Sequence, residues 1–345
     1  MVDPLSVQHK IIVVTVTYGD RWHHLAQVIP AVFQQQIVEA LVIVDNASSY
    51  DINAKISATF PTHLDDIIVL TQHENTGSAG GFSLGIRKAY ALQADFIYII
   101  DDDNLPEDQA VLLLYQTWNQ LNCTEPSALL SFRYRNLPNL QKAAHGEEIR
   151  YFHDKPNSFL GFSIGSLLRK YKRKAVKSIS QSTALLPQVK IQQAPYGGLF
   201  LPKGTIEHIG FPNEQLYLYA DDTEYTYRII QQGGEILMIT ASKLCDLETS
   251  WWSDVNALNK KWSVPLLEEG GFKAYYSTRN LTWFLWQNLS PNPVLFFLNG
   301  FIYLGFLFVM ALVSQKLHAY SIILLAVKDG ISGKLGKNPK MEKRV

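Results

Sequence analysis

Short, almost entirely apolar runs alternate with longer amphipathic segments over the first hundred residues of the chain. The runs are rich in Ile and Val, which is typical of strands buried on both faces of a parallel sheet. Strands that alternate with helices over short connections predict an α/β fold with a mostly parallel, doubly wound sheet flanked by helices. The predicted strands are Ile11–Val16, Leu41–Val44, Ile67–Leu70 and Phe96–Ile100.

Each predicted strand runs into a polar segment. Thr17–Arg21 follows the first strand, Asp45–Ser49 the second, His73–Gly81 the third and Asp101–Asn104 the fourth. In open α/β sheets, ligands bind in the crevice at the carboxyl ends of the strands. We therefore expect the active site at this shared edge.

Three consecutive carboxylates, Asp101, Asp102 and Asp103, follow the fourth strand. They would repel one another unless a cation shared them, and hard oxygen ligands suit Mg²⁺ or Mn²⁺. A solvated acidic loop is the alternative, because Asp is usually exposed. The position directly after a buried strand favours a metal site.

Two other segments at this edge have a physical use in binding a nucleotide. Asp45 could accept hydrogen bonds from a base or ribose, or could close an Asx turn with the residues that follow it. The Gly77–Gly81 loop opens a helix, so its backbone N–H groups could face a diphosphate. It has neither the Walker nor the dinucleotide glycine spacing, and a structural turn is equally compatible with it.

Two later motifs carry chemistry. Asp221 and Asp222 open a predicted helix, where one of them is expected as an N-cap or where the pair could supply a general base. Trp251, Trp252 and the segment Tyr275–Asn280 are aromatic-rich, which suits sugar stacking and equally suits core packing.

Composition narrows the function classes. With 31 basic and 31 acidic residues, the formal net charge is zero, which argues against a general nucleic-acid-binding protein. The two cysteines, Cys123 and Cys245, do not suggest a disulfide scaffold or a zinc site. Residues Met1–Lys10 lack the apolar core of a signal peptide, so we expect the catalytic part to stay in the cytosol.

The C-terminal part contains an uncharged stretch, Val294–Val313, that is long enough to span a membrane. A second apolar stretch, Ser321–Val327, precedes a basic tail. A single span would place this tail outside, against the positive-inside tendency, so we expect a re-entrant or in-plane helix that binds anionic lipid. A buried helix pair is the alternative. The basic segment Phe159–Lys177 suits an anionic lipid surface, a pyrophosphate-bearing acceptor or a solvated helix face.

Taken together, these motifs resemble the inverting family-2 glycosyltransferases of the GT-A fold, a Rossmann-like sheet flanked by helices. They are most similar to bacterial galactofuranosyltransferases and to their rhamnosyltransferase relatives. The matching segments span most of the chain in the order of that family. They are Val14–Arg21, Val42–Ser49, Asn75–Phe82, Asp101–Asn104, Gly197–Gly210, Asp221–Arg228 and Tyr275–Asn280.

The resemblance implies roles for individual residues. Asp222 would be the general base, supported by Asp221. The aromatic character of Trp251 and Trp252, independently of the resemblance, makes them our expected acceptor-binding residues. A histidine that the family often uses as a further metal ligand is missing from Ile236–Asp246, where Asp246 could replace it. The metal ligands would thus be Asp101, Asp103 and Asp246. The donor-binding residues would be Thr17, Arg21, Asp45, Asn75, Gly80, Asp102 and Arg279.

The expected protein is a metal-dependent inverting glycosyltransferase at the cytoplasmic face of a bacterial inner membrane. The resemblance implies transfer of galactofuranose from UDP-galactofuranose to a lipid-linked or polysaccharide acceptor of the cell envelope, with rhamnosyl transfer from dTDP-rhamnose as the alternative. A sugar-nucleotide pyrophosphorylase and a non-catalytic membrane scaffold of the same fold are the other classes considered. We expect a catalytic domain over residues 1–250 and a membrane-associated region over residues 251–345.

Overall fold

The computed structural model describes residues 9–135, 137–146, 155–165, 184–248, 266 and 271–342. Its strands are β1 (Ile11–Gly19), β2 (Val38–Ser48), β3 (Ile67–Gln72), β4 (Phe96–Asp101), β5 (Asn104–Pro106), β6 (Ala128–Arg133), β7 (Gln188–Ile191), β8 (Leu199–Pro202) and β9 (Ile236–Asp246). Its helices in the first part of the chain are α1 (Trp22–Phe33), α2 (Ile52–Thr59), α3 (Gly77–Ala91), α4 (Ala110–Gln120) and α5 (Pro138–Ala144). They are followed by α7 (Lys203–Ile209), α8 (Asp221–Gln231), α10 (Phe272–Asn288), α11 (Pro293–Val313), α12 (Leu317–Ile331) and α13 (Pro339–Glu342). Two short 3₁₀ helices lie at Pro61–His63 and Glu214–Leu216.

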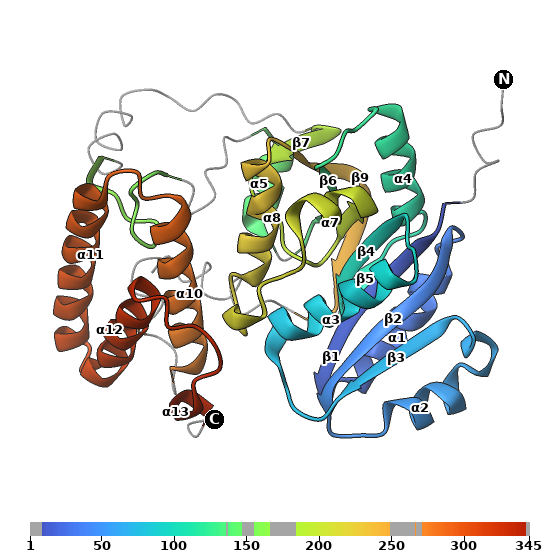
Figure 1. The fold of residues 1–345 in the computed structure, drawn as a ribbon, viewed down its shortest axis with the longest axis horizontal. Coiled ribbons are helices and arrows are strands. Elements are labelled where there is room, and N and C mark those ends of the chain that lie inside the picture. The colour runs from blue at the N-terminus through green and yellow to red at the C-terminus, as the bar shows by residue number, and fades with distance from the viewer. Residues whose placement is uncertain are drawn as a thin grey trace. The chain divides into compact units, whose positions relative to one another are not determined.

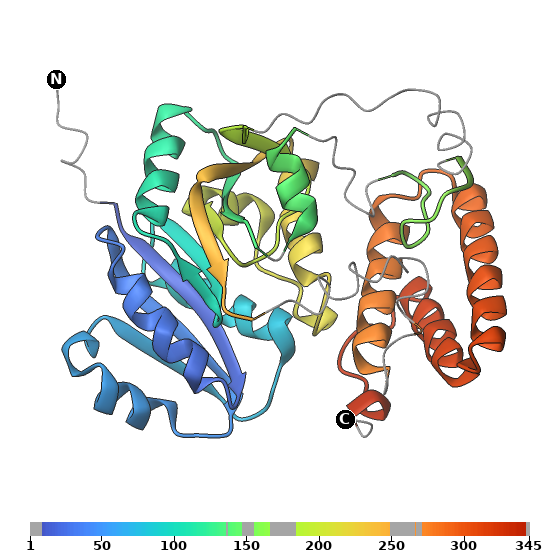
Figure 2. The ribbon, with the colours of Figure 1, turned by 180° about the vertical axis from the view of Figure 1, so that it is seen from behind.

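The described residues form two compact units (Figures 1 and 2). The first unit comprises residues 9–135, 137–146, 184–214 and 222–248 and contains the whole sheet. The second comprises residues 155–165, 215–221, 266 and 271–342. The segment 215–221, which leads into α8, therefore groups with the C-terminal helices rather than with the sheet.

The sheet has the strand order β3-β2-β1-β4-β8-β6-β9-β5, with β7 paired to β9. The four predicted strands are present as β1 to β4 and are mutually parallel, so their carboxyl ends share one edge. Beyond β4 the sheet is mixed, because β8 is antiparallel to β4 and β6 while β9 is parallel to β6. The predicted α/β class, with a parallel-rich sheet flanked by helices, is confirmed.

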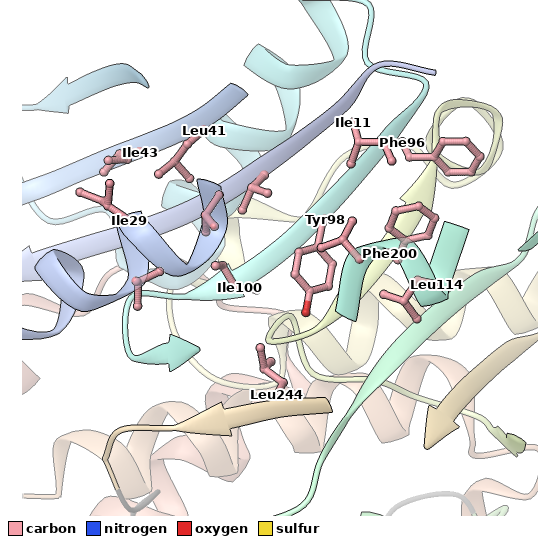
Figure 3. Packing of buried hydrophobic residues seen from close by; sticks show 14 of the residues in the cluster. Ile11, Ile29, Leu41, Ile43, Phe96, Tyr98, Ile100, Leu114, Phe200 and Leu244 are labelled. Atoms are coloured by element: carbon pink, nitrogen blue, oxygen red, sulfur yellow. The ribbon is translucent and has the colours of Figure 1, made fainter. Parts of the chain in front are cut away.

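Alternating residues of the central strands face helices on opposite sides of the sheet, as the period of two in a strand requires. On one face, Ile29 of α1 and Leu114 of α4 belong to the main hydrophobic core together with Ile43 of β2 and Tyr98 of β4 (Figure 3). On the other face α3 lies so close that a Cβ on Gly85 would be 2.5 Å from a Val14 methyl group and 3.1 Å from a Val44 methyl group. Because these strands are buried on both faces, nearly every position in their sequences is apolar.

The second unit is helical. Helix α10 packs along α12, and α11 lies beside them (Figures 1 and 2). Asn299 on α11 accepts a hydrogen bond from the backbone N–H of Ile164 and donates one to the carbonyl of Asn157, while Phe159 packs on Phe296. One side of α11 is therefore bound to the 155–165 segment.

The close packing of α3 on the sheet can be tested by its effect on stability. Replacing Gly85 by Ala should destabilise the first unit by about 1–3 kcal/mol, because the added methyl group overlaps Val14 in a packed core. Gly305→Ala is the matched helix control, since nothing lies within 4 Å of its Cβ position. Urea unfolding measures both variants, and equal stability of the two would contradict this account of α3 packing.

Candidate functional site

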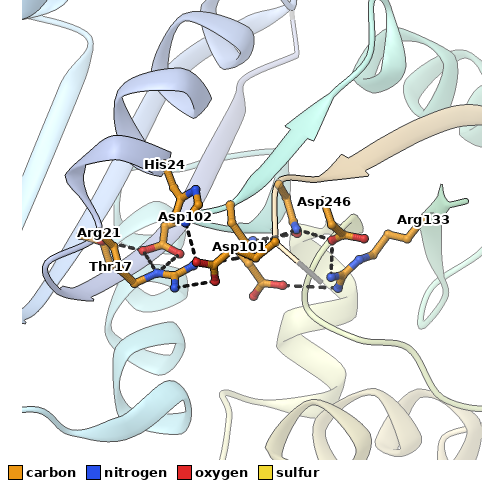
Figure 4. Close-up of polar contacts among 10 residues, drawn as sticks. Thr17, Arg21, His24, Asp101, Asp102, Arg133 and Asp246 are labelled. Atoms are coloured by element: carbon orange, nitrogen blue, oxygen red, sulfur yellow. Dashed lines mark hydrogen bonds and ion pairs between the residues drawn. The ribbon is translucent and has the colours of Figure 1, made fainter. Parts of the chain in front are cut away.

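Asp102, the middle acid of the triplet, is bound by two side chains from the end of β1 (Figure 4). The Thr17 hydroxyl donates to it at 2.7 Å, and the Arg21 Nε donates to both of its oxygens at 2.9 Å. Only 3% of Asp102 is exposed. Three predicted donor-binding residues, Thr17, Arg21 and Asp102, are thus brought together, and they bind one another.

Arg21 extends this network to the end of β9. Its Nη1 donates to Glu248 at 2.9 Å, and its Nη2 lies 3.5 Å from Asp103. His24 Nε2 lies 2.7 Å from the other Glu248 oxygen. His23, His24 and Glu248 place ligand atoms within 4.8 Å of one another, as in a metal site. The Arg21 guanidinium already supplies a positive charge to Glu248 in this cluster.

Asp101, Asp103 and Asp246, the predicted metal ligands, lie at the junction of β4, β5 and β9. Asn104 joins them, because its side-chain N–H group donates to Asp246 at 2.7 Å and to Asp103 at 3.3 Å. The guanidinium of Arg133, at the end of β6, bonds Asp246 and donates to Asp101 at 3.3 Å. Arg133 thus bridges two of the three acids (Figure 4).

The electrostatics of this acidic cluster are unbalanced. Burial and repulsion by Asp101 and Asp102 raise the pKa of Asp103 to about 7, against the opposing effect of Arg21 and Arg133. The pKa of Asp101 is also raised, first by burial and then, after the opposing effect of Arg133, by the charge of Asp246. A shared divalent cation would relieve this repulsion.

The residues present fit a divalent cation. The Oδ2 atom of Asp246 is buried and has no hydrogen-bond partner among the described residues. Gly197, just before β8, brings bare backbone to the same place, since a Cβ there would lie 2.6 Å from Arg133 Nη1 and 2.8 Å from Asp101 Oδ2. Carboxylate oxygens in such a cradle suit Mg²⁺ or Mn²⁺. Assignment of Asp101, Asp103 and Asp246 as ligands stays a prediction.

Asp222 lies in the first turn of α8, and its Oδ1 accepts the backbone N–H of Thr223 at 2.6 Å. Its pKa is raised to about 6, first by burial and then, against the hydrogen bond from Thr223, by repulsion from Asp101. The carboxylate therefore lies within electrostatic range of the triplet, and a pKa near neutrality suits a general base. Asp221, at the preceding position, is 3% exposed.

The predicted nucleotide site lies between the ends of β2 and β3. Asp45 Oδ1 accepts the backbone N–H of Ser48, three positions on, at 2.8 Å, so this side chain closes a local turn at the end of β2. Asn75 accepts the N–H of Gly77 at 2.8 Å. Gly80, in the first turn of α3, lies against Thr76, where a Cβ would overlap its side chain. Their predicted contacts with a donor remain predictions.

Asn46, a residue that the sequence analysis did not single out, organises this loop. Its Oδ1 accepts both the N–H and the hydroxyl of Thr76, at 2.8 and 3.0 Å. Its Nδ2 donates to the carbonyl of Gly77 at 3.0 Å and to Asn75 at 3.2 Å. The only signal in the sequence is its position beside Asp45 at a strand end.

The remaining predicted site residues lie elsewhere. Arg279, predicted to contact the donor diphosphate, is 1% exposed in α10 and belongs to the second unit. Its guanidinium donates to two backbone carbonyls, of Leu216 and Gly336, and to Asn280. Trp251 and Trp252 lie outside the described residues, as does most of the basic segment that ends at Lys177.

Arg133 is the second residue that sequence reasoning missed. The sequence did carry a signal for Arg133, because Ala128–Phe132 is another mostly apolar run followed by a polar residue, as the four predicted strands are. Only 8% of Arg133 is exposed, so its charge is compensated by Asp101 and Asp246 rather than by water. The guanidinium and a divalent cation would therefore share the same carboxylates.

This competition is testable with Arg133→Met, which removes the charge but keeps an unbranched apolar side chain. Leaving two acids unpaired should cost about 3–5 kcal/mol of stability without metal. Mn²⁺ should raise the melting temperature of this variant more than that of the parent, because ligand binding stabilises the folded state. Arg228→Met is the control, since Arg228 pairs with Glu224 instead. Equal Mn²⁺ effects in all three proteins would contradict a shared site.

Comparison with known proteins agrees with this architecture. Residues 12–173 match the model of glycosyl transferase family 2. The chain is 27% identical over 205 residues to galactofuranosyltransferase GlfT1 of Mycolicibacterium smegmatis, covering 59% of each protein. It is 25% identical over 209 residues to GlfT1 of Mycobacterium tuberculosis, covering 58% of each. The matched region is thus less than two thirds of these relatives.

A solved structure shows the fold. The crystal structure of GalNAc-T7 with UDP, GalNAc and Mn²⁺ superposes with a TM-score of 0.50 at 14% sequence identity, covering 70% of this chain and 44% of that one. At this identity the similarity concerns the fold alone. Residues 12–173 thus match glycosyl transferase family 2, the chain is similar at modest identity to the GlfT1 galactofuranosyltransferases, and its fold is similar to that of GT-A glycosyltransferases.

Proposed function

We propose that this protein is an inverting, metal-dependent glycosyltransferase that transfers galactofuranose from UDP-galactofuranose to a glycan acceptor. The observation that carries the proposal is the grouping of Asp101, Asp103 and Asp246 at one sheet edge, within electrostatic range of Asp222. Similarity to GlfT1 supports the choice of galactofuranose. The acceptor that we propose is a lipid-linked or polysaccharide glycan of the bacterial cell envelope.

Each group has a defined task in this reaction. Asp101, Asp103 and Asp246 would hold a divalent cation, which when bound stabilises charge developing on the leaving diphosphate. Asp222 would remove the proton of the acceptor hydroxyl as it attacks the anomeric carbon. A single displacement of this kind inverts the anomeric configuration. Arg133 would keep the acids together before substrate binds, because its guanidinium offsets their repulsion.

The reaction is tested first by ligand-dependent thermal stabilisation in the presence of Mn²⁺. UDP should raise the melting temperature more than dTDP, because a ligand that binds the folded state stabilises it by mass action. Asp222→Asn should keep this UDP effect and lose transfer from UDP-galactofuranose, because an amide cannot accept the proton. Normal turnover by Asp222→Asn would remove the base assignment.

Other outcomes of the nucleotide-binding and transfer experiments would change the assigned function. A larger effect of dTDP than of UDP would replace the galactofuranosyl assignment by rhamnosyl transfer from dTDP-rhamnose. Absence of any effect from either nucleotide, with and without Mn²⁺, would exclude nucleotide-sugar chemistry and leave a non-catalytic scaffold of the same fold. Full transfer in excess chelator would exclude the metal requirement.

We also propose that the protein acts at a membrane surface, bound through α11. Within the described residues, α11 is the one helix that is long and apolar enough to cross a bilayer. Its buried side carries the polar residues Asn299 and Tyr303, while its outer side is apolar along its length. Val294, Phe301 and Val313 are 77–79% exposed. Apolar insertion and attraction of basic residues to anionic lipid would place the enzyme at the cytoplasmic face of the inner membrane.

Phe301→Asp tests this surface. The substitution should lower affinity for vesicles of equal parts phosphatidylglycerol and phosphatidylcholine by about tenfold or more, because burying one Phe side chain is worth about 1.5–3 kcal/mol. Leu64→Asp is the matched control, since Leu64 is 44% exposed on the first unit. Co-flotation measures binding. Unchanged binding by Phe301→Asp would exclude α11 as the membrane contact.

A further inference from the structure

The segment directly before the proposed base has an unusual backbone. Tyr217, Tyr219 and Ala220 have φ angles of +64°, +65° and +60°. This left-handed region is uncommon for residues other than Gly and is normally adopted by single residues. Three such residues within four positions persist only if surrounding contacts impose the conformation, and strain of this kind concentrates at functional sites.

Two neighbouring residues of α10 make those contacts. The side-chain Nδ2 of Asn280 lies 2.8 Å from three carbonyls, those of Leu216, Leu218 and Tyr219. Arg279 Nη2 donates to the Leu216 carbonyl at 3.0 Å, and Arg279 Nε donates to Asn280 Oδ1 at 2.8 Å. One amide group is therefore oriented by an arginine and directed at the whole strained turn.

Arg279 and Asn280 are themselves held in place by buried contacts. Arg279 and Asn280 are 1% and 0% exposed, and the guanidinium lies 4.8 Å from the centre of the Tyr276 ring. Arg279 Nη1 donates to the carbonyl of Gly336, whose own N–H donates to the carbonyl of Gln215. Both sides of the 215–219 segment are thus fixed by hydrogen bonds within the second unit.

We propose that Arg279 and Asn280 are positioning residues that hold segment 216–220 in its left-handed conformation and thereby fix the start of α8. Asp221 and Asp222 follow this segment directly in the chain. This inference rests on the proposed role of Asp222 as the base. It assigns the Arg-Asn pair a task different from donor binding, because all three guanidinium nitrogens already donate to protein acceptors.

The proposed role of Asp222 as a general base explains why a strained backbone in segment 216–220 would be useful. The first turn of a helix frays easily, and a base must stay within hydrogen-bond reach of the hydroxyl that it deprotonates. Fixing the residues that enter α8 removes this freedom before the acceptor binds. The conformational cost is met by contacts of the second unit, which has no other described role in the chemistry.

Asn280→Ala tests the proposal, with Asn288→Ala as a matched control on the same helix. Asn288 donates to the Phe284 carbonyl of its own helix. Loss of positioning should lower kcat for transfer by about tenfold or more, since small displacements of a catalytic group are costly. The KM for the donor and the Kd for UDP should stay within twofold. A weakened Kd for UDP with unchanged kcat would overturn the proposal in favour of donor binding, and so would wild-type kcat.

A second substitution keeps the test independent of general damage to the fold. Ala220→Gly adopts a positive φ without strain, so combining it with Asn280→Ala should restore part of the lost kcat. Asn288→Ala combined with Ala220→Gly should show no such gain. If Asn280→Ala does not fold, Asn280→Asp replaces it, because Asp retains the acceptor for Arg279 but cannot donate to the carbonyls. If Ala220→Gly restores no kcat to the Asn280 variant that folds, the positioning role is contradicted.

Hydrogen–deuterium exchange separates this inference from the proposed function. Asn280→Ala should speed exchange of the amides of residues 215–222 relative to Asn288→Ala, and Ala220→Gly should slow it again. If the parent protein transfers no sugar but this exchange pattern appears, the proposed function fails while the clamp on the segment stands. Unchanged exchange in an active parent would remove the clamp and leave the function intact.

Discussion

The structure depends on how one sheet edge accommodates an excess of negative charge. Asp101, Asp102 and Asp103 follow a strand buried on both faces, so they cannot separate without moving the core. Two guanidinium groups offset them, Arg21 at Asp102 and Arg133 between Asp101 and Asp246. The compensation is incomplete, because the pKa of Asp103 is still raised to about 7. We propose that this uncompensated charge binds a divalent cation, which would connect the fold to the proposed chemistry.

The guanidinium groups of Arg21 and Arg133 have different tasks. Arg21 binds both oxygens of Asp102, which leaves that acid little capacity for a ligand, and it ties the ends of β1 and β9 together through Glu248. Arg133 leaves one oxygen of Asp246 without a partner among the described residues. In the proposed function the middle acid would have a structural task, whereas the outer acids and Asp246 would be the ligands of the metal. This distinction depends on which side chains surround each acid and not on the triplet itself.

The C-terminal helices add two surfaces with separate roles. On α10, Arg279 and Asn280 are directed at backbone carbonyls of the 215–219 segment. On α11, the polar residues Asn299 and Tyr303 face inward, so the outer side is uniformly apolar. In the proposed function the same helical unit would thus orient the segment before the base and attach the enzyme to the surface where a lipid-linked acceptor resides.

The sequence by itself determined the elements and the edge, because buried parallel strands are unbroken apolar runs and the residues that end them are polar. It thereby located β1 to β4, the acidic triplet, the start of α8 and the apolar helix α11. It could not determine the partners of these residues. Arg133, Asn46 and Asn280 act through contacts with residues that lie 29 to 113 positions away in the chain and that only the fold brings close to them. The tertiary structure alone decided that Asp45 closes a turn, that Arg279 binds backbone carbonyls and that Arg133 compensates the acids, since hydrogen bonds of this kind leave no periodic pattern in a sequence.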